Sequence, residues 1–239
     1  MILLVKIICL KPVSGRILVT GFQGLGYVGS LSIDHLVEAL KAKRIGYMET
    51  THTPPIVYVR GRKIQLPYEI YEHGNLLIFR FEGMFVNKSS SILMREVVRW
   101  AKNNGVEKMI LIGGLNKSYR EGDKDHVRFI ANKVYERIYG RVEPIVQDGI
   151  QIWGPLALLL NYAEIYDVPA LALLAYADPD RIDPRGAVNA LKALSSITRV
   201  KVNVSELMDK AEEIERELSI YESSKKEGGR ETKNSGMYA

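Results

Sequence analysis

Cysteine is almost absent from this 239-residue sequence, which contains only Cys9. A single cysteine excludes an intrachain disulfide and any zinc site built from several cysteines. The four histidines, His35, His52, His73 and His126, lie in unrelated segments and do not form a paired metal-binding spacing. We therefore expect no metal, and we expect Cys9 to be a buried, unreactive thiol within an apolar strand.

Long apolar runs are also missing. The apolar start of the chain is interrupted by Lys6 and ends at Lys11, well short of the roughly 20 residues of a membrane span. No basic segment precedes this run and no small-residue cleavage site follows it, so it does not match a secretory signal peptide. We expect a buried strand here, and a cytoplasmic protein without a membrane partner.

A strong excess of one charge is absent as well. The 33 Lys and Arg residues exceed the 28 Asp and Glu residues by five, and they are spread along the chain. Nucleic-acid-binding proteins concentrate basic residues on one face, so we expect no nucleic-acid partner. The remaining composition, with 46% apolar and 26% charged residues, is typical of a globular protein with a proper core.

Short apolar runs separated by Gly, Pro and polar clusters predict an α/β fold. The first expected unit is a strand over 17–20, a glycine loop over 21–29, a helix to about residue 43 and a strand over 44–49. We expect its two strands to be parallel neighbours joined by a right-handed crossover. Three strands with no helix between them follow over 56–60, 63–71 and 76–81, which predicts an inserted antiparallel β-meander.

The α/β alternation then resumes. Helices are predicted over 89–104, 125–139, 155–166 and 184–196, and strands over 109–112 and 170–175. Gly105 is expected to end the first of these helices in the left-handed conformation. The whole pattern predicts a mostly parallel sheet flanked by helices, with the meander inserted.

The C-terminal region divides into a helix and a tail. A helix beginning at Ser205 has an apolar seam at steps of four and three, which packs either on the body or on a partner's copy. Its members are Leu207, Ala211, Ile214, Leu218 and Tyr221. Residues 222–236 contain no apolar side chain, and such a composition predicts a flexible segment. We expect one domain over 1–221 and a flexible tail over 222–239.

The glycine loop allows two interpretations. Gly24, Gly26 and Gly29 form a G-x-G-x-x-G pattern between a strand and a helix, and Glu49 ends the next strand. A dinucleotide could bind such a loop, with Glu49 on its ribose, which would make the protein a nucleotide- or nucleoside-binding enzyme. Alternatively, the glycines serve only the tight strand-to-helix turn. The meander that follows Glu49 departs from a Rossmann half.

Two further segments are ambiguous in the same way. Gly113 and Gly114 follow a strand and either present N–H groups to an anion or form a turn. The run 178–185 contains Asp178, Asp180 and Asp183 with two arginines. It is either a partner-binding surface or the N-terminal cap of the next helix.

Five motifs in order resemble the proteasome-assembly-chaperone family, in its archaeal homologue branch. They are Gly24 to Ser30 (GLGYVGS), Pro54-Pro55, Leu111 to Leu115 (LIGGL), Gly149 to Leu156 (GIQIWGPL) and Asp183 to Ala187 (DPRGA). Together they cover roughly residues 15–218. One departure is Gln23, which stands where the family often has proline before the first glycine of the loop.

The resemblance implies an α/β fold related to nucleoside-phosphorylase-like proteins, without catalysis and without a cofactor. It also implies ATP-independent binding to proteasome α subunits during ring assembly. The glycine loop would then be structural or would face the partner. By analogy with the archaeal branch, we expect a homo-oligomer, with a tetramer favoured.

The end of the chain supports a proteasome partner independently. Met237, Tyr238 and Ala239 fit the hydrophobic-Tyr-any pattern of proteasome activators, in which the terminal carboxylate is captured between α subunits. A flexible tether of about 15 residues spans about 20–25 Å, which is enough to insert the motif into a groove. We therefore expect these three residues to bind the proteasome core particle, in assembly or in activation.

Overall fold

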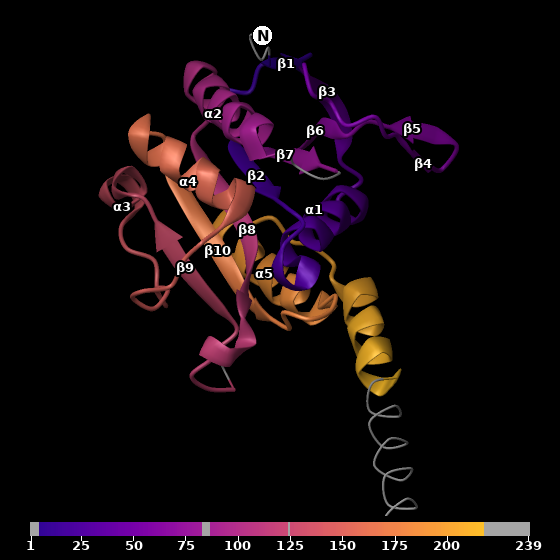
Figure 1. The fold of residues 1–239 in the computed structure, drawn as a ribbon, viewed down its shortest axis with the longest axis vertical. Coiled ribbons are helices and arrows are strands. Elements are labelled where there is room, and N and C mark those ends of the chain that lie inside the picture. Colours follow the sequence, from indigo (N-terminus) through magenta and orange to yellow (C-terminus); the bar gives the residue numbers. More distant parts are fainter. Residues whose placement is uncertain (1–4, 83–86, 124, 218–239) are drawn as a thin grey trace, which may run out of the picture.

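A computed structural model describes residues 5–82, 87–123 and 125–217, with only the backbone of residues 87–89 (Figure 1). Ten strands are found in this part of the chain. They are β1 (Val5–Cys9), β2 (Ile17–Gly21), β3 (Lys43–Thr50), β4 (Tyr58–Arg60), β5 (Lys63–Gln65), β6 (Tyr68–His73), β7 (Leu76–Phe81), β8 (Lys108–Asn116), β9 (Val127–Ala131) and β10 (Ala170–Ala177).

Eight of these strands form one mixed sheet in the order β1-β3-β6-β7-β2-β8-β10-β9. The central strands β7, β2, β8 and β10 are parallel to one another. Antiparallel pairs flank them, with β1, β3 and β6 at one edge and β9 at the other. The predicted class, an α/β fold with a parallel sheet core and antiparallel additions, is confirmed.

Helices cover both faces of the sheet (Figure 1). One face carries α2 (Asn87–Asn103) and α4 (Gly154–Ile165), which pack against each other. The other carries α1 (Val28–Ala39) and α5 (Pro184–Thr198), which also pack together. A short helix, α3 (Lys133–Tyr139), follows β9. No helix among the described residues has the length and apolar character that a membrane span requires.

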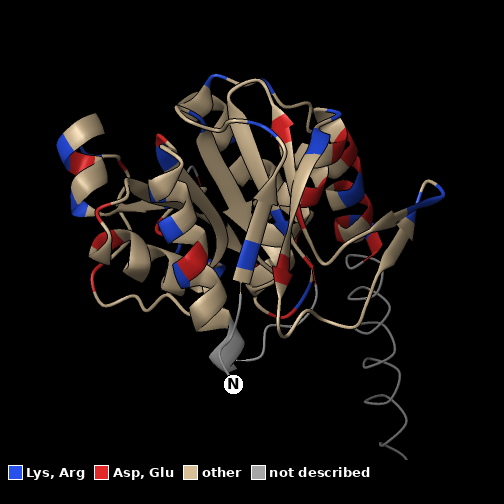
Figure 2. Cartoon of the chain, turned by 90° about the horizontal axis from the view of Figure 1, so that it is seen from above, with Lys and Arg blue, Asp and Glu red and all other residues tan. Residues whose placement is uncertain are grey.

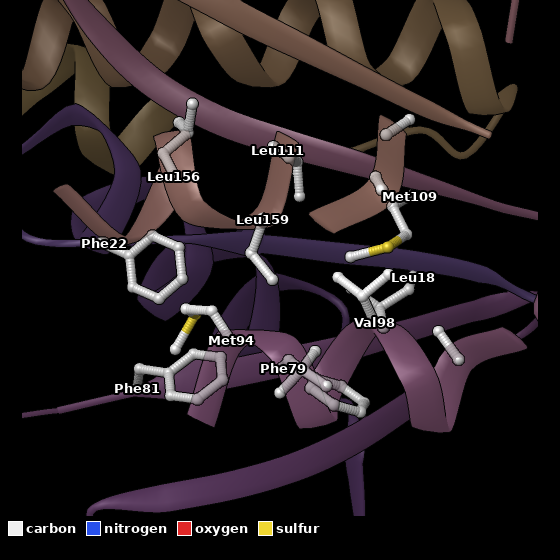
Figure 3. Packing of buried hydrophobic residues seen from close by; sticks show 14 of the residues in the cluster. Leu18, Phe22, Phe79, Phe81, Met94, Val98, Met109, Leu111, Leu156 and Leu159 are labelled. Carbon is white, nitrogen blue, oxygen red and sulfur yellow. The ribbon is translucent and has the colours of Figure 1, made fainter. Parts of the chain in front are cut away.

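Strand β10 shows how the two faces are filled. All eight of its residues are buried. Leu171 and Leu173 pack with α1 and α5, whereas Ala172 and Leu174 pack with α2 and α4. A central parallel strand buried on both faces is expected to be continuously apolar, as this one is. Figure 3 shows the second of these two cores, in which side chains of α2 and α4 meet those of the sheet.

The expected parallel pairing of the first βαβ unit is wrong. Strand β3 does not lie beside β2, because β6 and β7 separate them. Instead β3 pairs antiparallel with both β1 and β6, and the parallel neighbours of β2 are β7 and β8. After α1 the chain thus runs to β3, beside the edge strand β1. It then returns towards β2 through β6 and β7, which form a hairpin.

The predicted meander differs from the structure in its first two members. The segment predicted as one strand over 63–71 contains two strands, β5 and β6. Strands β4 and β5 form their own two-stranded sheet, which projects from the body (Figure 1). Pro67 lies between β5 and β6, where its missing N–H and restricted backbone suit a break between strands.

The helix predicted over 125–139 is also wrong in its first half. Residues 127–131 form β9, which pairs antiparallel with β10 at the sheet edge. Val127 and Phe129 are buried on one face, with Arg128 between them, an alternation of period two rather than a helical one. Asn132 then caps α3 by accepting a hydrogen bond from the Tyr135 N–H at 3.0 Å.

Both ends of the described chain lie at the edge of the core. Strand β1 is a half-exposed edge strand rather than the expected buried one. Residues 205–217 form the predicted last helix, whose Leu207 and Ala211 are buried against the body and whose Ile214 is half-buried. The seam residues Leu218 and Tyr221, and the whole of the predicted tail 222–239, lie outside the described residues.

Candidate functional site

Three segments that are far apart in the sequence meet in one cavity of about 640 Å3. They are the glycine loop 22–25, the end of β8 over 112–116, and the segment 149–156 that enters α4. The cavity therefore lies beyond the carboxyl end of β2, at the place where parallel sheets of α/β proteins commonly bind ligands. Three of the five family-like motifs of the sequence contribute to it.

The cavity lining is uncharged. Apolar side chains dominate, and the polar ones are Gln23, Asn116, Tyr119 and Gln151. Trp153 lies at its edge with 78% of its surface exposed. Without a lysine or arginine in the lining, the cavity is poorly suited to phosphate groups. It suits an apolar, neutral group that can form hydrogen bonds with amides and a tyrosine hydroxyl.

Gly26 and Gly29 are required by packing. Gly26 has a φ of +61°, and a Cβ atom there would lie 2.6 Å from the Cβ atom of Ala177. A Cβ atom on Gly29 would lie 2.6 Å from the backbone nitrogen and oxygen of Phe22. Gly24 differs, because its backbone is extended and a Cβ atom there would meet nothing within 4 Å. Only Gly24 of the three lines the cavity.

The backbone N–H groups of this loop are largely used within the protein. Those of Tyr27, Val28 and Ser30 donate to the carbonyl oxygens of Gly24, Leu25 and Phe22, respectively. A pyrophosphate bound at the start of α1 would need such donors to be free.

Glu49 does not lie where a ribose-binding acid belongs. It lies on β3, which β6 and β7 separate from β2. The geometry thus favours packing as the role of the loop glycines rather than dinucleotide binding.

Gly113 and Gly114 are neither a turn nor an open anion site. Both lie inside β8, opposite Leu174 and Ala175 of β10. A Cβ atom on Gly114 would lie 2.2 Å from the carbonyl oxygen of Leu25, so Gly114 allows the loop to cross directly over the strand. A Cβ atom on Gly113 would instead lie 2.7 Å from a side-chain methyl carbon of Leu156. The prediction that the strand ends at residue 112 is therefore wrong.

The acidic run after β10 is helix-capping chemistry. Asp183 caps α5 by accepting a hydrogen bond from the Gly186 N–H at 3.0 Å, and its other oxygen accepts one from Asp178 N–H at 2.9 Å. The Asp183 N–H donates to the carbonyl oxygen of Gly26 at 2.9 Å. The run thereby joins the glycine loop to α5, in agreement with the structural interpretation.

Asp178 also anchors two cations at this end of the sheet. Lys117 Nζ lies 2.8 Å and Arg181 Nε 3.1 Å from its Oδ2 atom. The hydrogen bond from Lys117 is the main reason why the pKa of Asp178 is lowered to about 2. This carboxylate is therefore ionised at any pH near neutrality.

The remaining candidate side chains do not assemble into a reactive site. His35 Nε2 lies 2.6 Å from the carbonyl oxygen of Asn203 and serves packing. Cys9 is half-buried on the edge strand rather than fully buried as expected, and its thiol donates to the Lys11 carbonyl oxygen. In the described ranges, no three His, Cys, Asp or Glu side chains are grouped so that they could hold a metal ion.

Sequence reasoning did not predict the cavity itself. In the sequence, the segment 149–156 was identified only as a family-like motif. Its two glycines, one on each side of Trp153, were the available signal of an unusual chain path. Gly149 and Gly154 have φ values of +84° and +78°, and both line the cavity. Met237, Tyr238 and Ala239, the predicted proteasome-binding residues, lie outside the described residues.

A model of the PAC2 family matches residues 18–221. The chain belongs to the PAC2 family. The match spans the glycine loop, the cavity and the last described helix, and it leaves out β1 at the sheet edge.

Solved structures share this fold. The structure of Pyrococcus furiosus PbaA, described as an archaeal homolog of proteasome-assembly chaperone, is 26% identical and covers 98% of this chain and 99% of that chain, with a TM-score of 0.77. P. furiosus PbaB, described as an archaeal proteasome activator, is 21% identical over 91% of this chain and 98% of that chain, with a TM-score of 0.74. A relative found by sequence, the protein MJ0106 of Methanocaldococcus jannaschii, is 25% identical over 84% of this chain and 83% of its own length.

Proposed function

We propose that this protein is an ATP-independent binding protein of the proteasome, which acts on α subunits during assembly or on the core particle during activation. The observation that carries the proposal is the likeness to PbaA over nearly the full length of both chains. PbaA is described as a homolog of a proteasome-assembly chaperone, and the PAC2 family membership of the chain is consistent with that role.

The cavity supports a binding role better than an enzymatic one. Its lining is uncharged and the loop glycines serve packing, so the geometry offers little to a nucleotide. The exposed Trp153 beside an apolar cavity is instead the kind of surface that anchors a protein partner. We include this cavity in the proposal as a contact of the α/β body with α subunits.

The tail provides the second part of the proposal. Met237, Tyr238 and Ala239 would insert between α subunits, with the apolar side chain in a groove, the Tyr hydroxyl in a hydrogen bond and the carboxylate on a lysine. Several tails on a homo-oligomer would bind together and raise the overall affinity without new contacts. A tetramer is our working expectation.

The test is to mix the full chain with isolated α subunits and with mature core particle, and to measure complex size and affinity. Tyr238→Ala is expected to weaken binding to the core particle about 10- to 100-fold per tail, since losing a buried hydrogen bond costs about 1–3 kcal/mol. Tyr238→Phe is the matched variant, which keeps the ring and removes only the hydroxyl. Its loss of affinity therefore measures the part of the effect that the hydrogen bond causes. If deletion of residues 237–239 leaves affinity unchanged, the tail is not the contact.

Trp153→Ala tests the contact of the body separately. It should weaken binding to isolated α subunits about tenfold. It should change the free energy of unfolding by no more than about 0.5 kcal/mol, because the side chain is exposed. Unchanged binding would remove the cavity from the proposal. Thermal stabilisation by millimolar NAD or ATP would favour the enzyme alternative, because a ligand at 100 times its Kd adds about 2.7 kcal/mol.

A further inference from the structure

The hairpin of β4 and β5, with the residues that lead into it, carries an uncovered apolar face. We call residues 56–65 the arm. Val59 and Ile64 lie opposite each other in its register and are 78% and 60% exposed. Ile56 and Val57, just before β4, are exposed as well. Exposed isoleucines occur elsewhere on the body, but the arm gathers four exposed valines and isoleucines on one projecting element.

The arm is a weak structure by itself. Its two strands belong to no larger sheet among the described residues, and an isolated two-stranded hairpin is at best marginally stable in water. An ion pair between Arg60 and Glu38 of α1 connects it to the body. Covering its apolar face would therefore stabilise the arm as well as the partner that covers it.

The arm is also basic. Arg60, Arg62 and Lys63 surround its turn, and the sequence has no acidic residue between Glu49 and Glu69. Figure 2 shows this basic tip at the projecting end of the hairpin. A partner for the arm must therefore offer carboxylates beside an apolar surface.

The last described helix of the same chain offers these features. Glu206, Asp209, Glu213 and Glu217 follow one another at steps of three and four, so they form an acidic stripe along one side of the helix. All four are exposed. Lys210 is one base on this side of the helix, so the four acids outnumber it. Like charges at this spacing destabilise a helix, and a further cation from a partner would relieve that cost.

Within the described ranges, the four acids of the stripe form no ion pair. Among the described residues, Glu215 is the only acid of this helix in an ion pair, and it binds Arg185 through two hydrogen bonds of 2.6 and 2.8 Å. The half-buried Ile214 adjoins the stripe. The helix thus combines free carboxylates with an apolar contact point, which complements the arm.

We propose that the arm of one copy binds the acidic stripe of a second copy, in a two-fold symmetric pair. Figure 1 shows the arm and the helix projecting on the same side of the molecule, so one two-fold rotation can exchange both contacts at once. Arm-to-arm pairing is disfavoured, because each arm carries three cations and no anion. This inference rests on the proposed self-association and names the surfaces that produce it.

The test is a charge exchange in the full-length chain. Variant A combines Arg62→Glu with Lys63→Glu, variant B combines Glu213→Lys with Glu217→Lys, and variant C carries all four substitutions. The control, Arg137→Glu with Arg141→Glu, makes the same charge change at exposed positions on and after α3. Sedimentation velocity over a concentration series gives the self-association constant of each, and thermal melting checks the fold.

We expect A and B each to weaken self-association at least about tenfold, and C to restore it to within about threefold of the unmodified chain. The control should change it little. A monomeric unmodified chain, unchanged association in A, or absence of rescue in C would overturn the proposal. So would an A variant that stays associated but loses the core particle, which would assign the arm to the proteasome.

The result is separable from the proposed proteasome role. Variants A and B keep residues 237–239, so each copy should still bind core particle, with only the loss of avidity. Conversely, deletion of residues 237–239 should leave self-association unchanged. If the unmodified chain associates through the arm but binds neither α subunits nor core particle, only the proteasome proposal fails.

Discussion

The half of the sheet that contains β10 (the apolar half) and the half that contains β6 and β7 (the charged half) are both buried, but they bury different kinds of side chain. All eight residues of β10 are buried and uncharged, whereas β6 and β7 bury Glu69 and Arg80, which are 0% and 3% exposed. An apolar strand needs only neighbours of suitable shape, but a buried charge needs particular partners at particular distances. The first half thus depends on complementary shape, and the second depends on a specific set of ion pairs.

Arg80 is the centre of that set. Its Nε atom lies 2.6 Å from Asp34 Oδ1 of α1, its Nη1 atom lies 3.7 Å from Glu69 Oε2, and Nη2 binds Glu82. The Tyr71 hydroxyl donates to Glu69 at 2.5 Å. Burial, followed by the contact with Glu69, raises the pKa of Tyr71 above its usual range. One arginine therefore contacts three carboxylates between α1 and the sheet, and Arg44 adds a second cation to Glu69 at 2.7 Å.

Removing Arg80 should give the largest effect in the charged half. Arg80→Met should lower the free energy of unfolding by about 3–5 kcal/mol, because it leaves buried carboxylates without their common cation. Urea unfolding followed by circular dichroism measures this. Arg95→Met is the matched control, whose half-exposed pair with Glu96 should be worth less than about 1 kcal/mol. Similar losses in both variants would contradict the role assigned to the network.

In the apolar half, the equivalent test is the addition of a single methyl group to a buried strand. Gly114→Ala should lower the free energy of unfolding by about 1–3 kcal/mol or more, because its Cβ atom must displace the Leu25 backbone. Gly24→Ala should change it by less than about 0.5 kcal/mol, since its surroundings are open. Unfolding curves of the two variants compare them directly. Equal stability would mean that the loop does not press on β8.

The smallest effect should come from the half-buried Asp178 and its two cations at the end of β10. The folded pKa of Asp178, about 2, lies below its ordinary value of 3.8. The stabilisation from its ion pairs is therefore present above pH 3.8 and is lost as the pH falls towards 2. Asp178→Asn should be less stable than the unmodified chain at pH 6, and the difference should shrink across this window. Melting curves from pH 2 to 6 would show it; a constant difference would be evidence against this titration.

Much of the apolar half was predictable. Continuous apolar runs and helical periodicity are local signals, and they placed several elements correctly within a few residues. These are the strands over 17–20 and 170–175 and the helices over 89–104, 155–166 and 184–196. Helix capping by the run 178–185 was one of two interpretations of the sequence, and the structure identifies Asp183 as the cap. This interpretation was available because a cap needs only the next few residues.

The antiparallel parts of the sheet were harder to predict from the sequence. Strand β9 was predicted as a helix, and β3 was expected beside β2. Both errors concern strands at or near the sheet edges, where the half-buried Arg128 and the exposed Tyr47 weaken the periodic signal. The cavity could not be predicted either, because Gly24, Gly114 and Trp153 come from three segments that meet only in the folded chain.

The sequence by itself determined the α/β class, the family resemblance and the absence of a cysteine-based site, because composition and short motifs carry these properties. Only the tertiary structure decided which strands are neighbours, why the loop glycines are needed and where the cavity lies. The physical reason is that strands pair through backbone groups common to all residues. The choice of neighbour then depends on how the whole set of faces is buried, rather than on any one segment.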